Sequence, residues 1–221
     1  MNRKPFGVGE WYHCYSRGVD KRRTFQSAAD YKRFLQLLYI ANTEKPFHFS
    51  NVKLPHEKVF QIDRGKSLVS VGAYALMPNH FHLLLQEVNE NGIARFMQKL
   101  GTAYGMYFNK KYERVGNLFV KPFRSKHIDS DAYLRRVAQY IHVNPVEIFE
   151  PEWKKGKAGE IKLVEKRLLA YPYSSLPFYL GSAQSERVIL CDIAMSTISS
   201  EMPSLQAILK DESEYQKELA L

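Results

Sequence analysis

Two apolar segments joined by a tight turn constrain the fold of this chain more than any other feature. Residues 67–77 are apolar and include β-branched valines, and residues 80–87 (HFHLLLQE) have a similar apolar character. Pro78-Asn79 lies between them and is a typical turn signal. Because this connection is so short, the two segments are predicted to be neighbouring antiparallel strands.

Further elements flank this hairpin on both sides. The predicted ranges are strands over residues 10–17 and 118–128, and helices that begin after Ser27, span 92–112 and run over 132–143. One helix therefore separates the first two strands, and another separates the third strand from the fourth. This order is that of a split βαβ unit, so the predicted fold class is α+β. It is a ferredoxin-like antiparallel sheet with helices on one face, followed by a C-terminal extension.

The signals for regular structure weaken after the last of these helices. Residues 151–167 form a Lys/Glu/Gly-rich linker, and residues 203–221 are predicted to be a helical tail. We therefore expect one domain over residues 1–148, and a linker with a mostly helical extension over residues 149–221. Within the domain, residues 43–66 mix proline, glycine and many charges and are predicted to lack firm structure.

Charge is distributed unevenly along the chain. Lys and Arg outnumber Asp and Glu 32 to 23, which gives a formal net charge of +9. In residues 91–128 eight basic residues stand against one acidic residue, with aromatic side chains among them, whereas residues 184–221 are acidic. Such a mixture of basic and aromatic side chains tracks phosphates and stacks bases. A solvated helix face is the alternative interpretation, and composition alone leaves both open.

Composition excludes several other classes of protein. The chain is 45% hydrophobic and 25% charged, which is typical of a globular protein and not of a disordered, collagen-like or coiled-coil chain. No window approaches 18 apolar residues without a charge, and no apolar stretch follows the first basic residues. Neither a membrane span nor a secretory signal is therefore expected. Cys14 and Cys191 are then expected to be reduced thiols in a cytoplasmic protein.

His80-Phe81-His82 is the sharpest candidate for chemistry. On a strand, residues i and i+2 point to the same face, so the two imidazoles are predicted to project together. Two neutral imidazoles on one face form half of a divalent-metal site. Two polar residues on a solvated face are the alternative, because a triplet of this kind often occurs by chance.

The last predicted helix carries a second candidate group. Tyr133 and Tyr140 are seven residues apart, and Tyr140 and Asn144 four, so the three share a stripe within about 40°. A phenol that faces the histidines can attack phosphorus once a metal ion draws charge from the phosphate oxygens. The side-chain oxygen of Asn144 suits a hard cation. In the alternative interpretation, the tyrosines are core residues of an amphipathic helix.

These residues stand in motifs that resemble a known family. ALMPNHFHLLL (75–85) together with YIHVNPV (140–146) strongly resembles the single-tyrosine HUH transposases. Within them the chain is most similar to the REP-associated tyrosine transposases, close to the insertion-sequence enzymes. The resemblance starts at YHCYSRG (12–18), covers most of residues 10–147 and resumes at YPYSS (171–175).

The resemblance implies a role for each candidate residue. His80 and His82 fall on the metal-binding pair of the family, and Tyr140 falls on the nucleophile. Asn144 falls on a polar residue that is a metal-ligand glutamine in the insertion-sequence branch. The implied cofactor is a divalent ion, Mg²⁺ or Mn²⁺, since phosphate oxygen, water and Asn144 would supply hard ligands beside the imidazoles.

The resemblance also implies a reaction and a partner. Such enzymes cut single-stranded DNA next to a hairpin, and the tyrosine stays bonded to the 5′ phosphate while a free 3′ hydroxyl leaves. Attack by the hydroxyl of another strand then rejoins the DNA. Candidate DNA-binding residues are Arg17, Lys21, Arg22, Arg23, Lys121, Arg124 and Lys126. In this interpretation the basic residues after the first strand bind a hairpin stem. In the alternative interpretation they only keep a surface loop solvated.

Some positions depart from the family or stay undecided. A basic residue commonly follows Asn144-Pro145-Val146 in the family, whereas Glu147 stands here, so the exit from the catalytic helix is expected to be rebuilt. His13, on the first strand, lies either on the active-site face or in the core. His142 is expected to be structural, because it points away from the side of the helix that carries Tyr140.

Two other classes of function fit part of this pattern. A non-catalytic, basic nucleic-acid-binding module with a ferredoxin-like fold would not need the His-Phe-His triplet and would be indifferent to chelators. A metal-dependent phosphodiesterase that uses water would cut DNA without a covalent adduct. A monomer and a homodimer both remain open, as does whether Tyr140 acts within its own chain. No membrane partner is expected.

Overall fold

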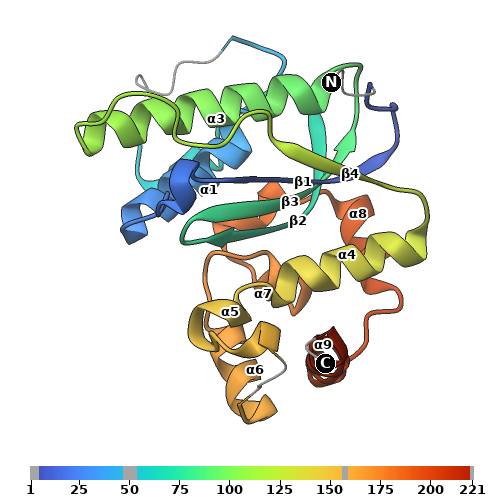
Figure 1. The fold of residues 1–221 in the computed structure, drawn as a ribbon. Helices are drawn as coiled ribbons and strands as arrows, with labels where there is room; N and C mark the ends of the chain where they lie inside the picture. The colour runs from blue at the N-terminus through green and yellow to red at the C-terminus, as the bar shows by residue number, and fades with distance from the viewer. Residues whose placement is uncertain (1–4, 47–53, 156–158, 220–221) are drawn as a thin grey trace.

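The computed structural model describes residues 5–46, 54–155 and 159–219 (Figure 1). A four-stranded sheet in the order β2-β3-β1-β4 forms its centre. The strands are β1 (Trp11–Arg17), β2 (Val69–Met77), β3 (His80–Glu87) and β4 (Arg124–Ile128). Every neighbouring pair is antiparallel, which confirms the predicted ferredoxin-like order.

The predicted hairpin of β2 and β3 contains one irregularity. The register between the strands shifts between Val71 and Ala73, which indicates a β-bulge at Gly72. A Cβ added to Gly72 would come within 3.0 Å of the Trp11 ring and 3.2 Å of the Leu84 side chain. Glycine therefore allows these neighbours to approach the bulged backbone closely.

β4 is shorter than the strand predicted over residues 118–128. The segment before Arg124 is a loop, although the Val120 N–H still donates to the Arg17 carbonyl at 2.8 Å. Pro122 has no N–H to donate and interrupts the ladder at this point. The loop consequently lies against the end of β1.

Two long helices cover one face of the sheet. They are α1 (Ala28–Ile40) and α3 (Gly92–Lys111). Ser27 and Asp30 form a capping box at the predicted start of α1. The buried Glu87 carboxylate accepts hydrogen bonds from the Gly92 N–H (3.0 Å) and the Ile93 N–H (2.7 Å) at the start of α3. These contacts satisfy N–H groups that a helix start leaves without partners.

The main core lies between this face and the two helices. Phe34 of α1 meets Phe81 of β3 and Tyr104 of α3, with ring centroids 5.0 Å apart in both pairs. The buried Tyr104 hydroxyl donates to the Thr24 carbonyl at 2.6 Å, so its polar atom is satisfied. One face of β1 and β3 packs in this core. Because side chains alternate along a strand, every second residue of β1 and β3 lies on the opposite face.

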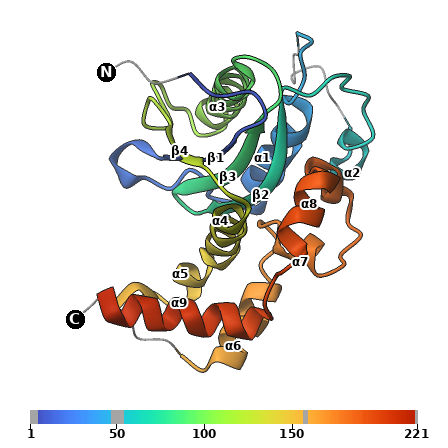
Figure 2. The ribbon, with the colours of Figure 1, turned by 90° about the vertical axis from the view of Figure 1, so that its right-hand side faces the viewer.

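The opposite face, which was predicted to carry no helices, also carries two, α4 (Asp131–Val143) and α8 (Asp192–Ser199) (Figures 1 and 2). Ser130 caps α4, where its hydroxyl accepts a hydrogen bond from the Tyr133 N–H at 3.3 Å. Small side chains on β2, Ala73 and Ala75, belong to the same apolar cluster as the buried residues of α4. They allow α4 to lie close to the sheet.

A segment from the C-terminal extension covers the outer edge of β2. We call residues 171–175 (YPYSS) the edge segment. The Leu76 N–H donates to the Tyr173 carbonyl at 2.9 Å, and the Ser175 N–H donates to the Tyr74 carbonyl at 2.9 Å. The edge segment therefore extends the hydrogen bonding of the sheet beyond β2.

The other helices are short or lie in the C-terminal extension. They are the 3-10 turns η1 (Val19–Lys21), η3 (Trp153–Lys155) and η4 (Ser185–Ile189), and the helices α2 (His56–Val59), α5 (Val146–Phe149), α6 (Ile161–Leu169), α7 (Leu176–Tyr179) and α9 (Leu205–Leu219). α2 lies within residues 43–66, where no firm structure was predicted; residues 47–53 lie outside the described residues. No helix in the described part of the chain is long and apolar enough to cross a membrane.

The last helices form a lobe below α4 (Figures 1 and 2). Buried side chains of η3, α6 and α9, among them Trp153, Leu168 and Leu209, share one apolar cluster with Val143 and Val146. α6 lies mostly within the predicted linker, and α9 occupies the predicted helical tail. Residues on both sides of position 148 therefore pack together in one cluster. The division into 1–148 and 149–221 stays a prediction.

Candidate active site

The candidate site lies on the sheet face that carries α4. Tyr15 of β1 pairs with His82 of β3, so these two side chains share a face. His80 and His13 are two residues away from them on the same strands and point to that face as well. Phe81, between the two histidines, belongs to the core on the opposite face.

Each histidine of the triplet has a hydrogen-bond partner at its Nδ1 atom. His80 Nδ1 donates to Asn79 Oδ1 at 2.7 Å, and His82 Nδ1 lies 2.8 Å from Nε2 of His13. The rings of His80 and His82 are nearly perpendicular, at 84°, with their centroids 5.0 Å apart. Asn79, predicted only as a turn residue, therefore also orients a histidine.

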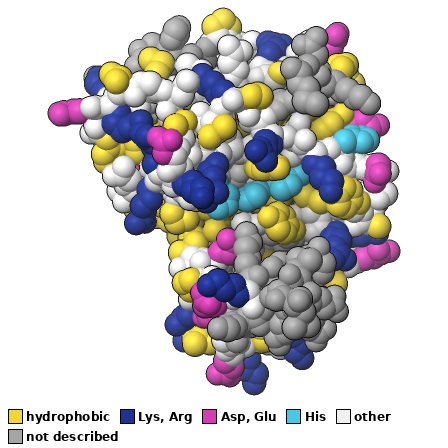
Figure 3. Space-filling view, viewed as in Figure 1, with side chains coloured by type: hydrophobic (Ala, Val, Ile, Leu, Met, Phe, Trp, Pro, Cys, Tyr) yellow, Lys and Arg dark blue, Asp and Glu magenta, His cyan; other side chains and the backbone are white. Residues whose placement is uncertain are grey.

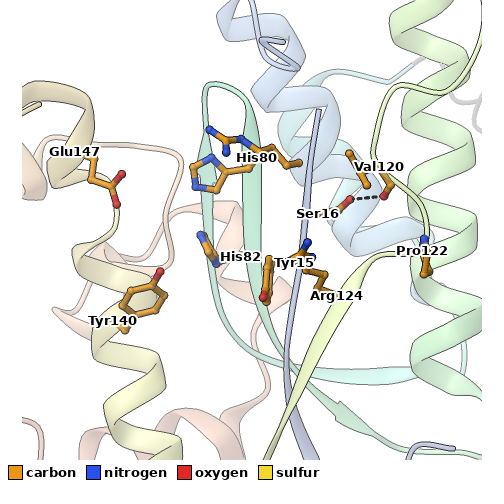
Figure 4. A pocket seen from close by; sticks show the side chains of 10 residues that line it. Tyr15, Ser16, His80, His82, Val120, Pro122, Arg124, Tyr140 and Glu147 are labelled. Atoms are coloured by element: carbon orange, nitrogen blue, oxygen red, sulfur yellow. Dashed lines mark hydrogen bonds between the residues drawn. The ribbon is translucent and has the colours of Figure 1, made fainter. Parts of the chain in front are cut away.

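Tyr140 lies beside these rings, near the C-terminal end of α4. Its ring centroid is 5.7 Å from that of His82 and 5.9 Å from that of His13, with an edge-to-face arrangement in both pairs. Ile141 and other apolar residues of α4 pack on the sheet, whereas Tyr140 lies at the flank and is 37% exposed. One chain therefore brings the phenol and the paired imidazoles together (Figure 4).

These side chains line a cavity of about 380 Å³. Its lining residues are Tyr15, Ser16, Arg17, His80, His82, Val120, Pro122, Arg124, Tyr140 and Glu147. Figure 4 shows the Tyr140 hydroxyl and the Glu147 carboxylate on one side of the cavity, with the two histidines across from them. In Figure 3, histidine side chains are visible in the middle of the molecular surface that faces the viewer, with Lys and Arg side chains around them.

Asn144 does not line this cavity, contrary to its predicted place beside Tyr140. Its side chain is buried, at 4% exposure, and its amide oxygen and nitrogen have no hydrogen-bond partner among the described residues. Four residues advance a helix by about 40° beyond a full turn. Tyr140 already lies at the flank of α4, so this rotation turns Asn144 toward the buried side that Ile141 occupies.

Burial keeps His13 and His142 neutral. Burial lowers the pKa of His13 to about 4, and the positive charge of Lys126 adds to this effect. Burial also lowers the pKa of His142 to about 3, and Nε2 of His142 lies 2.9 Å from the Ser175 hydroxyl. His142 is outside the cavity lining and has the structural role that was expected of it.

The predicted DNA-binding residues divide into groups. Arg17 and Arg124 line the cavity. Arg22 is held by its own loop, since it donates to the Val19 carbonyl at 2.8 Å and to the Asp20 carboxylate at 2.9 Å. Lys126 lies over the Tyr133 ring, 5.1 Å from its centroid. Lys21, Arg23 and Lys121 are exposed at the surface.

The lining residues that were not predicted are Tyr15, Ser16, Val120, Pro122 and Glu147, and two of them, Glu147 and Tyr15, carry groups that could take part in chemistry. Glu147 is seven residues after Tyr140, as Tyr140 is seven after Tyr133, so the stripe of α4 continues past Pro145 into α5. That spacing was the signal for Glu147, but the helix was predicted to stop at Asn144-Pro145. Tyr15 is two residues after His13 and was recognisable from the period of a strand.

The described side chains supply only part of a metal site. Within residues 5–46, 54–155 and 159–219, no group of three or more His, Cys, Asp or Glu side chains is close enough to hold a metal ion. The chemistry of this cavity is therefore that of a phenol beside two imidazoles, with Arg17 and Arg124 to attract an anion.

Comparison with known proteins agrees with this geometry. The family profile of IS200-like transposases matches residues 22–144, which is more than half of the chain. No curated protein matches the chain. A solved structure of a REP-associated tyrosine transposase bound to a REP hairpin has a similar fold, with a TM-score of 0.50 at 12% identity. The similarity covers 83% of this chain and 86% of that chain. The chain belongs to the IS200-like transposases, a family of the single-tyrosine HUH superfamily.

Proposed function

We propose that this transposase cuts and rejoins single-stranded DNA through Tyr140, with formation of a 5′-phosphotyrosine. The observation that carries the proposal is the position of the Tyr140 ring, 5.7 Å from His82 and 5.9 Å from His13 at the cavity that His80 also lines. A phenol that served only to pack the helix would not need to face a cavity lined by imidazoles and guanidinium groups.

The histidine pair fits a divalent ion. Imidazole nitrogens bind divalent ions at roughly 2.1 Å, which places two rings on one ion about 5 Å apart. The observed centroid separation of His80 and His82 is 5.0 Å. The hydrogen bond from His80 Nδ1 to Asn79 makes Nε2 the ring nitrogen with the lone pair, as ligation requires. The proposed cofactor is accordingly Mg²⁺ or Mn²⁺, which His80 and His82 would hold.

A bound ion would draw charge from the phosphate oxygens and so make the phosphorus more electrophilic. The Tyr140 oxygen attacks this phosphorus, forms the new P–O bond and loses its proton. The bond from phosphorus to the 3′ oxygen breaks, and that oxygen leaves as a hydroxyl after it takes a proton. Attack by the 3′ hydroxyl of another strand reverses these changes and rejoins the DNA.

In this proposal Glu147, and not Asn144, is the polar residue after Tyr140 that reaches the cavity. The cavity lining includes the Glu147 carboxylate and not the Asn144 amide. Carboxylate oxygen suits a hard cation, but the described side chains contain no three-residue metal cluster. We therefore place Glu147 outside the direct ligands, where its carboxylate would orient water beside an ion held by His80 and His82.

The proposed substrate is single-stranded DNA that carries a hairpin. A REP hairpin is bound in the solved structure of similar fold. Arg17 and Arg124 lie in the cavity lining and are placed to neutralise the scissile phosphate and its neighbour. Lys21, Arg23 and Lys121 are exposed on the loops beyond β1 and before β4, and we assign them to the hairpin backbone.

A covalent-adduct experiment tests the proposal. The wild-type chain, incubated with Mn²⁺ and a labelled hairpin oligonucleotide, should give a protein–DNA band on a denaturing gel. Tyr140→Phe should lose this band entirely, because the nucleophilic oxygen is gone. Tyr133→Phe is the matched control, since Tyr133 lies on the same stripe of α4 outside the cavity and should keep the band.

Other outcomes of this experiment identify the alternatives. Cleavage without a covalent band would indicate a phosphodiesterase that uses water. Hairpin binding without cleavage, unaffected by a chelator, would indicate a non-catalytic nucleic-acid-binding module. An unchanged band from Tyr140→Phe would reject the assignment of the nucleophile. His80→Ala and His82→Ala should each abolish cleavage and keep part of the hairpin binding, because the basic surface is unchanged.

A further inference from the structure

We propose that His13 is a positioning residue of the metal site, which selects the tautomer of His82 that can bind the ion. This inference rests on the proposed function, because it needs His82 to be a ligand. Nε2 of His13 lies 2.8 Å from Nδ1 of His82, and both side chains are buried. Their rings stack at 26° with centroids 5.0 Å apart.

The strands fix this pair independently of any ion. His13 on β1 is directly opposite Leu84 on β3, and His82 is two residues from Leu84 on the same face. Such diagonal neighbours are within reach of long side chains. The contact is therefore built into the register of the central strand pair.

One proton between the two rings decides which nitrogen of His82 can bind an ion. A neutral imidazole carries a single N–H, so one ring donates this hydrogen bond and the other accepts it. When His82 donates through Nδ1, its Nε2 carries the lone pair. When His13 donates instead, the N–H of His82 is at Nε2, and that nitrogen cannot bind a metal ion. Ligation by His82 therefore requires His13 to accept.

His80 has the same arrangement with a different acceptor. Its Nδ1 atom donates to Asn79 Oδ1 at 2.7 Å, and an amide oxygen can only accept. Each predicted ligand thus has at Nδ1 a partner that can accept a hydrogen bond, and when that partner accepts, Nε2 is the nitrogen for coordination. Loss of a partner of this kind, which holds a metal ligand in place, typically weakens metal binding 10–100-fold.

A purely structural role for His13 is the alternative, and the choice of variants separates the two. The His13 ring also contacts Tyr140 and Tyr15, with centroids 5.9 Å and 5.1 Å away. His13→Phe preserves an aromatic ring and removes the acceptor. His13→Gln loses the ring and keeps an oxygen near the position of Nε2, so it should rescue an acceptor role and not a packing role.

The experiment measures Mn²⁺ binding to the full chain by electron paramagnetic resonance, without DNA. We expect His13→Phe to bind Mn²⁺ roughly 10–100-fold more weakly than wild type and His13→Gln to bind within about threefold of it. Hairpin binding in a chelator should be the same for all three proteins. Equal Mn²⁺ affinity for His13→Phe and wild type would overturn the inference, as would a loss in His13→Gln as large as that in His13→Phe.

A second measurement needs no variant at position 13. Nitrogen chemical shifts of the wild-type histidine rings, recorded with diamagnetic Zn²⁺, should show His82 protonated at Nδ1 and bound through Nε2. Ligation through Nδ1 would overturn the inference and leave the metal site standing. If wild type fails to bind Mn²⁺, or if His82→Ala binds as wild type does, the proposed metal site falls and the role of His13 with it.

Discussion

Asp30 shows how strongly one buried carboxylate can tie two helices together. Its oxygens accept hydrogen bonds from the Gln26 N–H (2.8 Å), the Ser27 N–H (2.9 Å), the Tyr107 hydroxyl (2.9 Å), Lys111 Nζ (2.6 Å) and the Tyr112 hydroxyl (2.8 Å). Burial alone would raise its pKa, but the hydrogen bonds from Lys111 and Tyr112, with the others, outweigh burial and hold the pKa at about 2.

This carboxylate makes the stability of the fold depend on pH. The folded pKa is lower than the ordinary value of 3.8, so the contribution is present above that value and is lost as the pH falls toward 2. The shift corresponds to roughly 2 kcal/mol. Asp30→Asn should lower the free energy of unfolding in urea by about this amount at neutral pH, with a difference from wild type that narrows below about pH 4.

A second aspartate provides the control for this measurement. Asp20 is 77% exposed and forms an ion pair with Arg22 at the surface. Asp20→Asn should change the free energy of unfolding by less than about 0.5 kcal/mol, because exposed ion pairs contribute little. If Asp30→Asn proves as mild as Asp20→Asn, the link between α1 and α3 has been overestimated.

At the residue scale, local spacing predicted some site residues and missed others. The i, i+2 rule was sufficient for His80 and His82, because a strand fixes the direction of each side chain. The spacing of four residues on a helix grouped Asn144 with Tyr140. Because Tyr140 lies at the flank of α4, the further rotation of about 40° from Tyr140 to Asn144 is enough to turn a side chain from the cavity into the core. Which flank of α4 faces the cavity depends on its packing against the sheet, and spacing along one helix does not contain that information.

Among the elements, the edge segment connects the sheet to the helix of Tyr140. The Ser175 hydroxyl accepts a hydrogen bond from the Tyr74 N–H at 2.9 Å and lies 2.9 Å from His142 Nε2. His142 is two residues after Tyr140 on α4 and is fully buried. One hydroxyl thus links the rotation of α4 to the position of β2.

Two neighbouring serines allow this link to be tested. Ser175→Ala should lower the free energy of unfolding by about 1–3 kcal/mol, because the buried Tyr74 N–H and the His142 ring lose their partner. Ser174→Ala should change stability little, since the equally buried Ser174 hydroxyl has no hydrogen-bond partner among the described residues. Equal urea midpoints for the two variants would contradict the role of Ser175.

The elements themselves were largely predictable, and their long-range contacts were not. The hairpin, α1, α3 and α4 follow from periodicity and capping signals, which act within a few residues. The edge segment was visible only as a motif with aromatic residues, because its structure consists of hydrogen bonds to residues about a hundred positions earlier. α6 was missed because four of its nine residues are charged and lie in a segment rich in Lys, Glu and Gly, and only its buried face, with Val164 and Leu168, shows that it packs.

For the whole molecule, the decisive arrangement is a sheet with helices on both faces. α1 and α3 make the main core on one face, and α4 carries Tyr140 across the other face to the histidines of β1 and β3. The C-terminal lobe is built on the end of the same helix, through Val143 and Val146. All the groups of the proposed reaction therefore belong to one chain.

A mixing experiment tests whether one chain is sufficient. Tyr140→Phe lacks the proposed nucleophile and His82→Ala lacks a proposed ligand, so neither should form the covalent adduct alone. If the site is built within one chain, a mixture of the two variants should remain inactive at any ratio. Wild type diluted with either variant is the control, and its adduct should scale with the wild-type fraction. Adduct on the His82→Ala chain in the mixture would show that Tyr140 is donated between subunits.

The occupied rim of β2 has a consequence for how this protein behaves when it is concentrated. The unpaired N–H and C=O groups of an exposed edge strand can pair with a strand of another molecule, and sheets of separate molecules associate in this way. Here residues 171–175 form hydrogen bonds with one edge of the sheet, β2. The other edge is β4, which is only five residues long and carries the side chains of Arg124, Lys126 and His127. The charges of Arg124 and Lys126 on so short an edge disfavour pairing with a second copy of the sheet, and in the proposed function the same two charges would attract the phosphates of the DNA.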